Sequence, residues 1–475
     1  MAIQTPTIHS INPTTEEVLA EFALFSPQQI DQALTDARQA FLAWRERSFD
    51  ERARLMRRAA HNLRQNKQRY ARLITLEMGK PITQAEAEID KCAWNCDFYA
   101  ENAERMLADE HVETNARESF IAYEPLGVIL AIMPWNFPFW QVIRHAAPVL
   151  MTGNTIVLKH ASNVPQCALA LEEVFRDAGF PPGVFRTLLV SSSQVPDIIG
   201  DGRIAAVTLT GSDATGTQVA SVAGRFLKKT VMELGGSDPF IVLEDADLDA
   251  AAQTGAMARC QNTGQSCIAA KRFIVVDRVF DEFRERFVQA VATLRVGNPL
   301  ERETQIGPLA RGDLRDQLDQ QVHASVQQGA EVLLGGAKLP GRGYFYQPTV
   351  LANVSHDMPV WREETFGPVA VLIRAKDEQE ALALANETQF GLGASIWTRD
   401  AERGKRLARR IEAGNVFVNG MVASDPRLPF GGVKRSGYGR ELGVFGVREF
   451  VNIKTIWVGP ARGPQMPAPA QAPSE

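Results

Sequence analysis

The feature that most constrains the fold is a regular alternation of short apolar runs with amphipathic stretches after residue 128. Residues 155–158 and 205–210 have the apolar character of strands, and residues 165–178 between them have the spacing of a helix. Such alternation predicts parallel strands joined by crossover helices. A second alternating stretch follows residue 234, so we predict an α/β protein with two lobes that meet near Leu234 and follow a helical segment over residues 26–106.

The composition excludes several classes of protein. The net charge of −5 lacks the basic excess of a nucleic-acid binder, and no apolar run approaches the ~20 residues of a membrane span. The first ten residues do not have the pattern of a secretory signal. Five cysteines in 475 residues argue against a disulfide scaffold and for a reducing, cytoplasmic compartment. The Pro- and Ala-rich residues 459–475 should be disordered.

Two of these cysteines could suggest a metal site, because Cys92 and Cys96 lie four residues apart in a helical stretch. No His or Cys completes a ligand set nearby, so we interpret both as small buried residues and predict no metal.

The strongest local signal for chemistry is the segment 262–267, which ends at Cys267. A polar turn containing Gly264 precedes this cysteine, and the helix-compatible residues 268–270 follow it. Such a position can expose a sulfur and lower its pKa, as a nucleophile requires. Taken alone, the segment fits a buried, inert thiol equally well. Cys260, in a helical run, lacks this setting and is interpreted as structural.

Two further motifs carry groups suited to catalysis. Glu233 ends an apolar strand and precedes Gly235 and Gly236, and burial would raise its pKa toward that of a general base. A structural ion pair is the alternative. Asn136 lies in the Pro-bracketed loop 134–138, where its amide could stabilise an oxyanion or simply form a turn.

Phosphate binding has one candidate. Gly211 and Ser212 end a strand and open a helix, whose N-terminal N–H groups can receive phosphate. The segment 437–439 resembles part of a dinucleotide fingerprint but fails its glycine spacing, so we interpret it as a polar loop.

Taken in order, five motifs resemble the NAD(P)-dependent aldehyde dehydrogenase superfamily: residues 134–138, 233–236, 264–267, 363–368 and 429–434. The resemblance runs from about residue 11 to residue 457. It implies an α/β fold with a Rossmann-type cofactor domain (1–106 and 126–234), an α/β catalytic domain (235–440) and a small β bridging element (107–125 and 441–458). In the family this oligomerisation element builds homodimers or homotetramers.

The resemblance also assigns roles. Cys267 would attack the aldehyde, the Asn136 side chain and the Cys267 N–H would hold the oxyanion, and Glu233 would activate the water that hydrolyses the thioester. The implied cofactor-binding residues are Trp135, Lys159, Ser162, Gly211, Ser212, Leu234, Glu364 and Phe366. Lys159 and Ser162 would meet the adenosine ribose, and Glu364 and Phe366 the nicotinamide ribose.

Two segments, 158–165 and 424–430, look like the succinate-semialdehyde dehydrogenase branch. There Arg144 and Ser424 would bind a substrate carboxylate. Gln261 stands where some members have an arginine, so the carboxylate would depend on Arg144 and Ser424, and the alternative for Arg144 is a surface or interface ion pair. The family places a glutamate that repels the 2′-phosphate of NADP where this chain has Ser162, so NADP should be preferred and NAD remain possible.

Three other functions compete with this one. The chain could oxidise an uncharged or longer aldehyde, act as a catalytically silent structural member, or transfer the acyl group to CoA. Intact Cys267, Glu233 and Asn136 argue against a silent member, and Glu233 favours hydrolysis over transfer to CoA.

Overall fold

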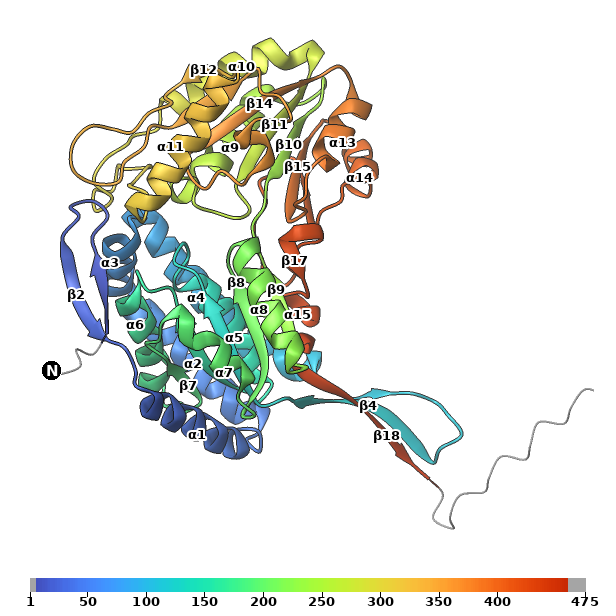
Figure 1. Ribbon diagram of the computed structural model, residues 1–475. Helices are drawn as coiled ribbons and strands as arrows, with labels where there is room; N and C mark the ends of the chain where they lie inside the picture. The colour runs from blue at the N-terminus through green and yellow to red at the C-terminus, as the bar shows by residue number, and fades with distance from the viewer. Residues whose placement is uncertain (1–5, 460–475) are drawn as a thin grey trace, which may run out of the picture.

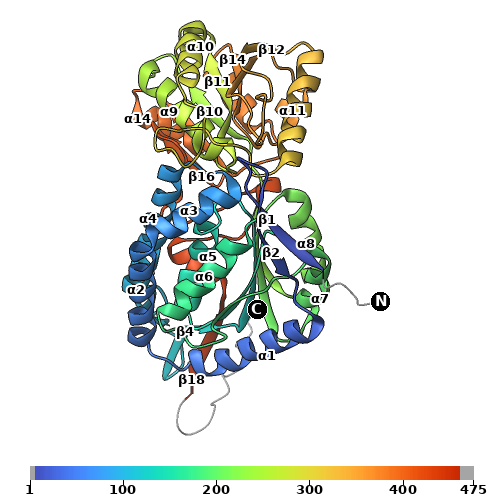
Figure 2. The same ribbon diagram turned by 90° about the vertical axis from the view of Figure 1, so that its left-hand side faces the viewer.

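The computed structural model describes residues 6–459, in which two α/β lobes lie one above the other (Figure 1). The predicted α/β class is confirmed. Two strands near the N-terminus, β1 (Thr7–Ile11) and β2 (Val18–Ala23), form a small antiparallel sheet beside the lower lobe (Figure 2). Residues 460–475, which hold all but one residue of the predicted disordered tail, lie outside the described residues.

The N-terminal segment forms the predicted helices. They are α1 (Pro27–Trp44), α2 (Phe49–Gln65), α3 (Lys67–Met78) and α4 (Ile82–Met106). Ser26 and Ser48 start α1 and α2 with capping boxes, which satisfy the free N–H groups of the first turn. The long helix α4 packs against α2 and α5, and five of its residues line a cavity that also borders Cys267.

The lower lobe is built on a six-stranded sheet in the order β17-β9-β8-β5-β6-β7. Its strands are β5 (Val128–Met133), β6 (Thr155–His160), β7 (Phe185–Thr187), β8 (Ile204–Thr210), β9 (Lys229–Glu233) and β17 (Gly437–Tyr438). Its helices are α5 (Trp140–Met151), α6 (Pro165–Asp177), α7 (Val195–Gly200) and α8 (Asp213–Arg225). All strands except β17 are parallel.

The chain order reverses between β5 and β8, because β6 and β7 follow on one side of β5 while β8 and β9 follow on the other. In open parallel sheets the carboxyl ends of the two strands at such a point form the ligand crevice. The prediction of a polar loop at 437–439 is wrong, because Gly437 and Tyr438 form β17, which pairs with Glu233 and Met232 of β9. Two residues are too few to show the alternation of apolar and polar side chains that marks a strand in a sequence. Gly437 and Tyr438 form a strand only because they pair with β9, which is distant in the chain.

The upper lobe contains a seven-stranded sheet in the order β12-β13-β14-β11-β10-β15-β16. Its strands are β10 (Asp238–Val242), β11 (Ala270–Val276), β12 (Glu331–Leu334), β13 (Thr349–Ala352), β14 (Val369–Ala375), β15 (Gly393–Trp397) and β16 (Asn415–Val418). Its helices are α9 (Leu248–Cys260), α10 (Asp277–Ala292), α11 (Gly312–Gln327), α12 (Pro359–Arg362), α13 (Glu378–Asn386) and α14 (Ala401–Ala408).

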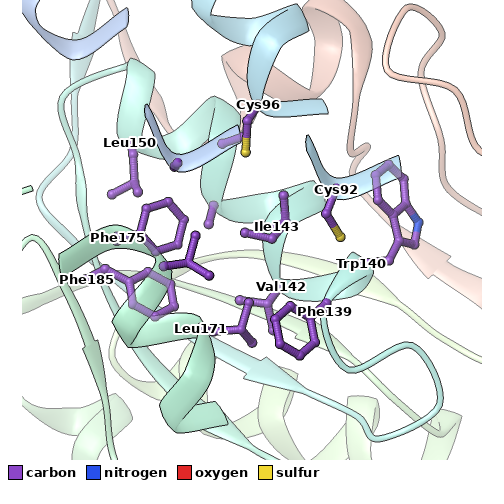
Figure 3. Packing of buried hydrophobic residues seen from close by; sticks show 14 of the residues in the cluster. Cys92, Cys96, Phe139, Trp140, Val142, Ile143, Leu150, Leu171, Phe175 and Phe185 are labelled. Carbon is purple, nitrogen blue, oxygen red and sulfur yellow. The ribbon is translucent and has the colours of Figure 1, made fainter. Parts of the chain in front are cut away.

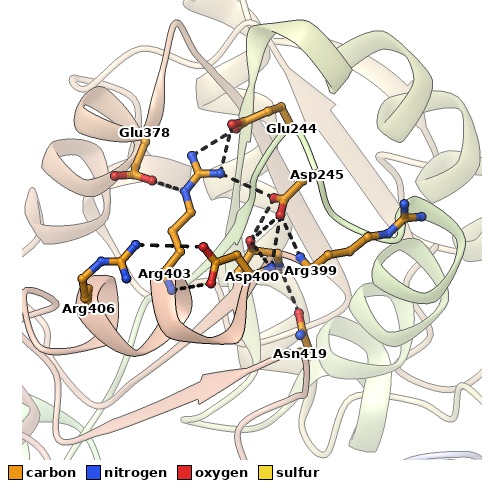
Figure 4. A network of polar contacts seen from close by, with 9 residues as sticks. Glu244, Asp245, Glu378, Arg399, Asp400, Arg403, Arg406 and Asn419 are labelled. Atoms are coloured by element: carbon orange, nitrogen blue, oxygen red, sulfur yellow. Dashed lines mark hydrogen bonds and ion pairs between the residues drawn. The ribbon is translucent and has the colours of Figure 1, made fainter.

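A polar network fastens α14 to this sheet (Figure 4). The Arg403 guanidinium pairs with Glu378 at the start of α13 and donates to Glu244 at 2.9 Å. Asp245 accepts from the Thr398 hydroxyl at 2.8 Å. These contacts fix the end of β15, whose other end adjoins the segment that follows Glu233.

A third sheet forms an arm that extends away from both lobes (Figure 1). It contains β3 (Glu110–His111), β4 (Glu118–Pro125) and β18 (Val451–Val458), in the order β18-β4-β3. The helix α15 (Gly443–Glu449) leads into β18. The boundaries predicted for the cofactor, catalytic and oligomerisation domains remain a proposal.

The interpretation of Cys92 and Cys96 as buried residues is confirmed. Both lie in α4 and pack among apolar side chains of the lower lobe, including Ile143 of α5 (Figure 3). Burial raises the pKa of both thiols, which makes them unreactive. Across residues 6–459, no helix combines the length and apolar character needed to cross a membrane.

Candidate active site

Two cavities meet at Cys267. The first has a volume of about 380 Å³ and the second about 340 Å³, and both are lined by Cys267 and Gln141. The first cavity is also lined by the predicted residues Trp135, Asn136, Gly211, Ser212, Leu234, Glu364 and Phe366. The second is also lined by the predicted residues Arg144, Gln261 and Ser424 and by Lys91, Trp140 and Phe430. Cys267 therefore borders both cavities.

The segment before Cys267 is a tight turn, the 3-10 helix η2 (Gln261–Gly264). Asn262, Thr263 and Gly264 all have positive φ, and a Cβ on Gly264 would clash with the backbone of Gly367. Asn262 stabilises the turn by donating to the Gln265 carbonyl at 3.0 Å. The turn thus requires glycine at 264 and fixes the direction in which the chain reaches Cys267.

Two expectations for Cys267 are wrong. Residues 268–270 do not open a helix, because the chain passes into β11 at Ala270, where pairing with β10 and β14 outweighs local preference. The pKa of Cys267 is also not lowered: burial raises it to about 12, although Arg144 and Lys271 oppose that shift. Without a helix N-terminus beside the sulfur, desolvation outweighs the two cations and raises the pKa of the thiol.

Lys271 organises the nucleophile segment, and the sequence analysis missed it. Its side chain is 2% exposed, and its ammonium donates to the carbonyl oxygens of Ser266 and Cys267 at 3.1 Å and of Ala269 at 3.3 Å. It also lies 3.4 Å from a Glu364 carboxylate oxygen. Two adjacent cations, Lys271 and Arg272, at the start of a strand that is otherwise apolar were the available signal, because a buried ammonium needs such partners.

Asn136 follows β5 and lies beside the nucleophile turn. Its Nδ2 donates to the Gln265 carbonyl at 3.1 Å, and its Oδ1 accepts from the Gln141 side chain at 3.0 Å. Asn262 Nδ2 donates to the Asn136 carbonyl at 2.7 Å. These contacts orient the amide, and since Nδ2 carries two N–H groups, the second is left for an oxyanion at Cys267.

Glu233 ends β9, as predicted, and is 2% exposed. Burial, and then the neighbouring Glu441 carboxyl, raise its pKa well above the usual value. Its carboxyl lies against Gly431, where a Cβ would come within 2.8 Å of Glu233 Oε1. Glu233 is not among the residues that line the two cavities, so the base role requires the side chain to turn toward Cys267.

The glycines after Glu233 allow this segment to approach the nucleophile. A Cβ on Gly236 would lie 2.6 Å from the Cys267 carbonyl oxygen, and a Cβ on Gly235 would clash with Glu364. The Gly236 N–H donates to Glu364 Oε1 at 3.0 Å. Only residues without a side chain permit Glu233, Cys267 and Glu364 to converge here.

For Arg144 the structure shows the ion-pair alternative, but the pair is buried rather than at a surface. Arg144 and Glu441 form an ion pair in which each side chain is 3% exposed. The guanidinium also donates to the Thr210 hydroxyl at 3.4 Å and lies 4.9 Å from the Phe430 ring centroid. Glu441 was not singled out from the sequence, because nothing local marks it as the partner of a residue 297 positions earlier.

Among the other predicted cofactor residues, Lys159, Ser162 and Ser212 lie at the carboxyl edge of the six-stranded sheet. Lys159 is half-buried in β6, and Ser162 is exposed just beyond it, but neither lines the first cavity. Ser212 caps α8, its hydroxyl accepting from the Thr215 N–H at 3.3 Å. Phe366 meets Trp135 edge to face, 5.7 Å between ring centroids. Helix N–H donors, a lysine and the Glu364 carboxylate suit the phosphates and ribose hydroxyls of a dinucleotide.

Comparison with known proteins places the chain in a family. The model of the aldehyde dehydrogenase family matches residues 2–456, and the chain belongs to that family. A probable succinate-semialdehyde dehydrogenase [NADP(+)] of Synechocystis is 53% identical over 451 residues, which are 95% of this chain and 99% of that protein. The succinate semialdehyde dehydrogenase [NAD(P)+] Sad of Escherichia coli is 50% identical over 455 residues, 95% of this chain and 98% of that protein.

The comparison with solved structures agrees with this family assignment. Succinic semialdehyde dehydrogenase from Streptococcus pyogenes, crystallised with NADP+, has a TM-score of 0.94 and 38% identity, covering 95% of this chain and 100% of that one. Gox0499 has a TM-score of 0.94 and 43% identity, with the same coverage. The aldehyde-dehydrogenase-like fold implied by the motifs is thereby confirmed.

Proposed function

We propose that this enzyme oxidises succinate semialdehyde to succinate with NADP+. The observation that carries the proposal is the position of Cys267, which lines both a cavity suited to a dinucleotide and a cavity with positive charge for a carboxylate. The names of the relatives from Synechocystis and Escherichia coli support the substrate and the cofactor.

The first half-reaction forms a thioester on Cys267. Its sulfur bonds to the aldehyde carbon as the thiol proton passes to solvent water, and the C=O π pair moves to oxygen. The free Asn136 N–H and the Cys267 N–H stabilise this oxyanion, whose collapse expels the carbon-bound hydrogen as hydride. NADP+, when bound, supplies the acceptor for that hydride. Arg144 and Lys271 favour the thiolate, since each lowers the pKa of Cys267.

The second half-reaction hydrolyses the thioester. Glu233 takes a proton from water as the water oxygen bonds to the acyl carbon, and the carbon–sulfur bond breaks to release succinate and restore Cys267. Burial raises the pKa of Glu233, so its ionised form is a stronger base than an ordinary carboxylate and is more populated at higher pH.

NADP+ would be held at the edge formed by β5, β6 and β8. Gly211 and Ser212, at the N-terminus of α8, would bind the pyrophosphate, and Glu364 and Phe366 the nicotinamide ribose. Ser162, exposed and neutral, leaves room for a 2′-phosphate that Lys159 can pair with. NAD+ lacks that phosphate and would be accepted less well.

The second cavity would hold the substrate chain. Arg144, Ser424 and Gln261 line it together with Cys267, and the Ser424 hydroxyl is a donor for the far carboxylate. Since Glu441 already pairs with Arg144, this guanidinium contributes less net charge than a free arginine.

We further propose that the enzyme is a homodimer or homotetramer of the cytoplasm. On the edge strand β18, the apolar side chains of Ile453 and Trp457 are 61% and 50% exposed, which suits burial against a second copy. The five cysteines, all within the described residues, form no disulfide, which is consistent with a reducing compartment.

Product analysis tests the proposal. The purified enzyme, incubated with succinate semialdehyde and NADP+ in ¹⁸O-labelled water without CoA, should form labelled succinate and an equal amount of NADPH. A requirement for CoA would identify an acyl-transferring enzyme instead. The absence of turnover with any aldehyde would identify a structural member of the family.

A further inference from the structure

Lys91 was not among the predicted site residues, but its side chain lies at the wall of the second cavity. Lys91 lies on α4 and lines the second cavity together with Cys267. Its ammonium donates to the Ser424 hydroxyl at 2.8 Å and lies 4.3 Å from the centroid of the Trp140 ring, which lines the same cavity. Lys91 is thus held from two sides at the wall of the cavity.

The other charges around this cavity are already matched. Arg144 pairs with Glu441. Glu88, one turn before Lys91 on α4, pairs with Lys80 and accepts from the Phe139 and Trp140 N–H groups, each at 2.9 Å. Across residues 6–459, Lys91 forms no ion pair, so it provides the uncompensated positive charge of the cavity wall.

The nearest acidic group beyond the cavity is also engaged. Asp425, next to Ser424, pairs with Arg427 at 2.6 Å. Ser424 accepts one of the three N–H groups of Lys91 and keeps its own hydroxyl hydrogen to donate. A carboxylate between Lys91 and Ser424 would receive hydrogen bonds from both.

We propose that Lys91 is a specificity-determining residue that, with Ser424, binds the carboxylate of the substrate. The inference rests on the proposed function and names the charge that selects a semialdehyde of a dicarboxylic acid over an uncharged aldehyde. Arg144 then has a mainly structural role as the counter-ion of Glu441.

The charge state of Lys91 suits this role. Burial, and then the neighbouring Arg144, lower its pKa to about 8, while the Cys92 thiol, Asp425 and Glu88 act in the opposite sense. The ammonium is therefore mostly protonated at neutral pH, and desolvation makes a carboxylate partner more favourable.

The test compares succinate semialdehyde with butanal, which has a methyl group in place of the carboxylate. In Lys91→Met the ratio of their kcat/KM values should fall by about 10- to 100-fold, the worth of one hydrogen bond to a charged group, mainly through the KM for succinate semialdehyde. Lys91→Arg should restore most of the ratio. Lys67→Met is the matched control, because Lys67 pairs with Asp90 of α4 outside the cavity, and it should keep the wild-type ratio.

The outcomes separate this inference from the function on which it rests. A wild-type ratio near one would overturn the proposed substrate and with it the role of Lys91. A high wild-type ratio that persists in Lys91→Met would overturn the role of Lys91 alone. A loss in Lys91→Met that Lys91→Arg does not restore would overturn the role of charge. The Ki of succinate as a competitive inhibitor provides a second readout, and it should rise in Lys91→Met by a similar factor.

Discussion

Replacing Arg144 with methionine should destabilise the protein strongly, because it removes the only ion-pair partner of Glu441 among the described residues. Both side chains are 3% exposed, and the Glu233 carboxyl lies close enough to add repulsion. Breaking a buried ion pair costs about 3–5 kcal/mol when one charge is left behind. The double variant Arg144→Met/Glu441→Met should recover most of this loss, since an apolar pair of similar volume is close to neutral.

The effect has a definite pH dependence. Burial raises the pKa of Glu441, and Arg144 opposes that shift, so the variant raises this pKa further. When folding raises the pKa of a carboxyl, the folded protein becomes less stable as the pH rises above the pKa of that carboxyl in the unfolded chain, near 4.5. The deficit of Arg144→Met should therefore grow with pH, by up to about 1.4 kcal/mol per pH unit.

Urea unfolding followed by circular dichroism at pH 6 and pH 8 measures both effects. Arg176→Met is the matched control, because Arg176 and Asp177 form a pair with side chains 66% and 55% exposed, and it should change stability by less than about 1 kcal/mol. An Arg144→Met variant as stable as wild type at pH 8, or equally destabilised at both pH values, would refute the reasoning.

Three further predictions concern catalysis. Cys267→Ala should abolish turnover while NADP+ binding, measured by fluorescence quenching, persists; turnover near wild type would exclude Cys267 as nucleophile. Glu233→Gln should slow the steady state and preserve a burst of NADPH, and the wild-type hydrolysis step should accelerate with rising pH because the Glu233 pKa is raised; an unaltered steady-state rate in stopped flow would contradict this. Ser162→Glu should lower kcat/KM for NADP+ by about 10-fold or more through repulsion of the 2′-phosphate, and equal NADP+ use by both proteins would show that Ser162 does not select the cofactor.

Local patterns predicted most of the fold. The strand–helix alternation identified β6 and β8, and the helical segment predicted over residues 26–106 contains α1 to α4. The helix predicted to open at Gly211 and Ser212 begins at Asp213, with Ser212 as its N-terminal cap. The prediction of a loop at 437–439 failed because β17 forms only through its pairing with β9, a segment distant in the sequence.

The residues of the candidate site also fall into those that local motifs identify and those that only the folded structure identifies. Asn136, Glu233 and Cys267 lie in ordered motifs and could be chosen from the sequence. Lys91 and Lys271 could not, because their importance comes from groups that folding brings near them, such as Ser424 and the carbonyls of the nucleophile segment. The pKa of Cys267 was misjudged for a related reason, since burial depends on the surrounding lobes and not on the adjacent turn.

The central claim is that Cys267 serves a cavity for NADP+ and a cavity for an aldehyde with a carboxylate. Steady-state kcat/KM values for succinate semialdehyde and butanal, each with NADP+ and with NAD+, test it most directly. The account predicts the highest value for succinate semialdehyde with NADP+, lower values when either the carboxylate or the 2′-phosphate is missing, and the lowest when both are missing. Equal values for the two aldehydes, or a strong preference for NAD+, would contradict it.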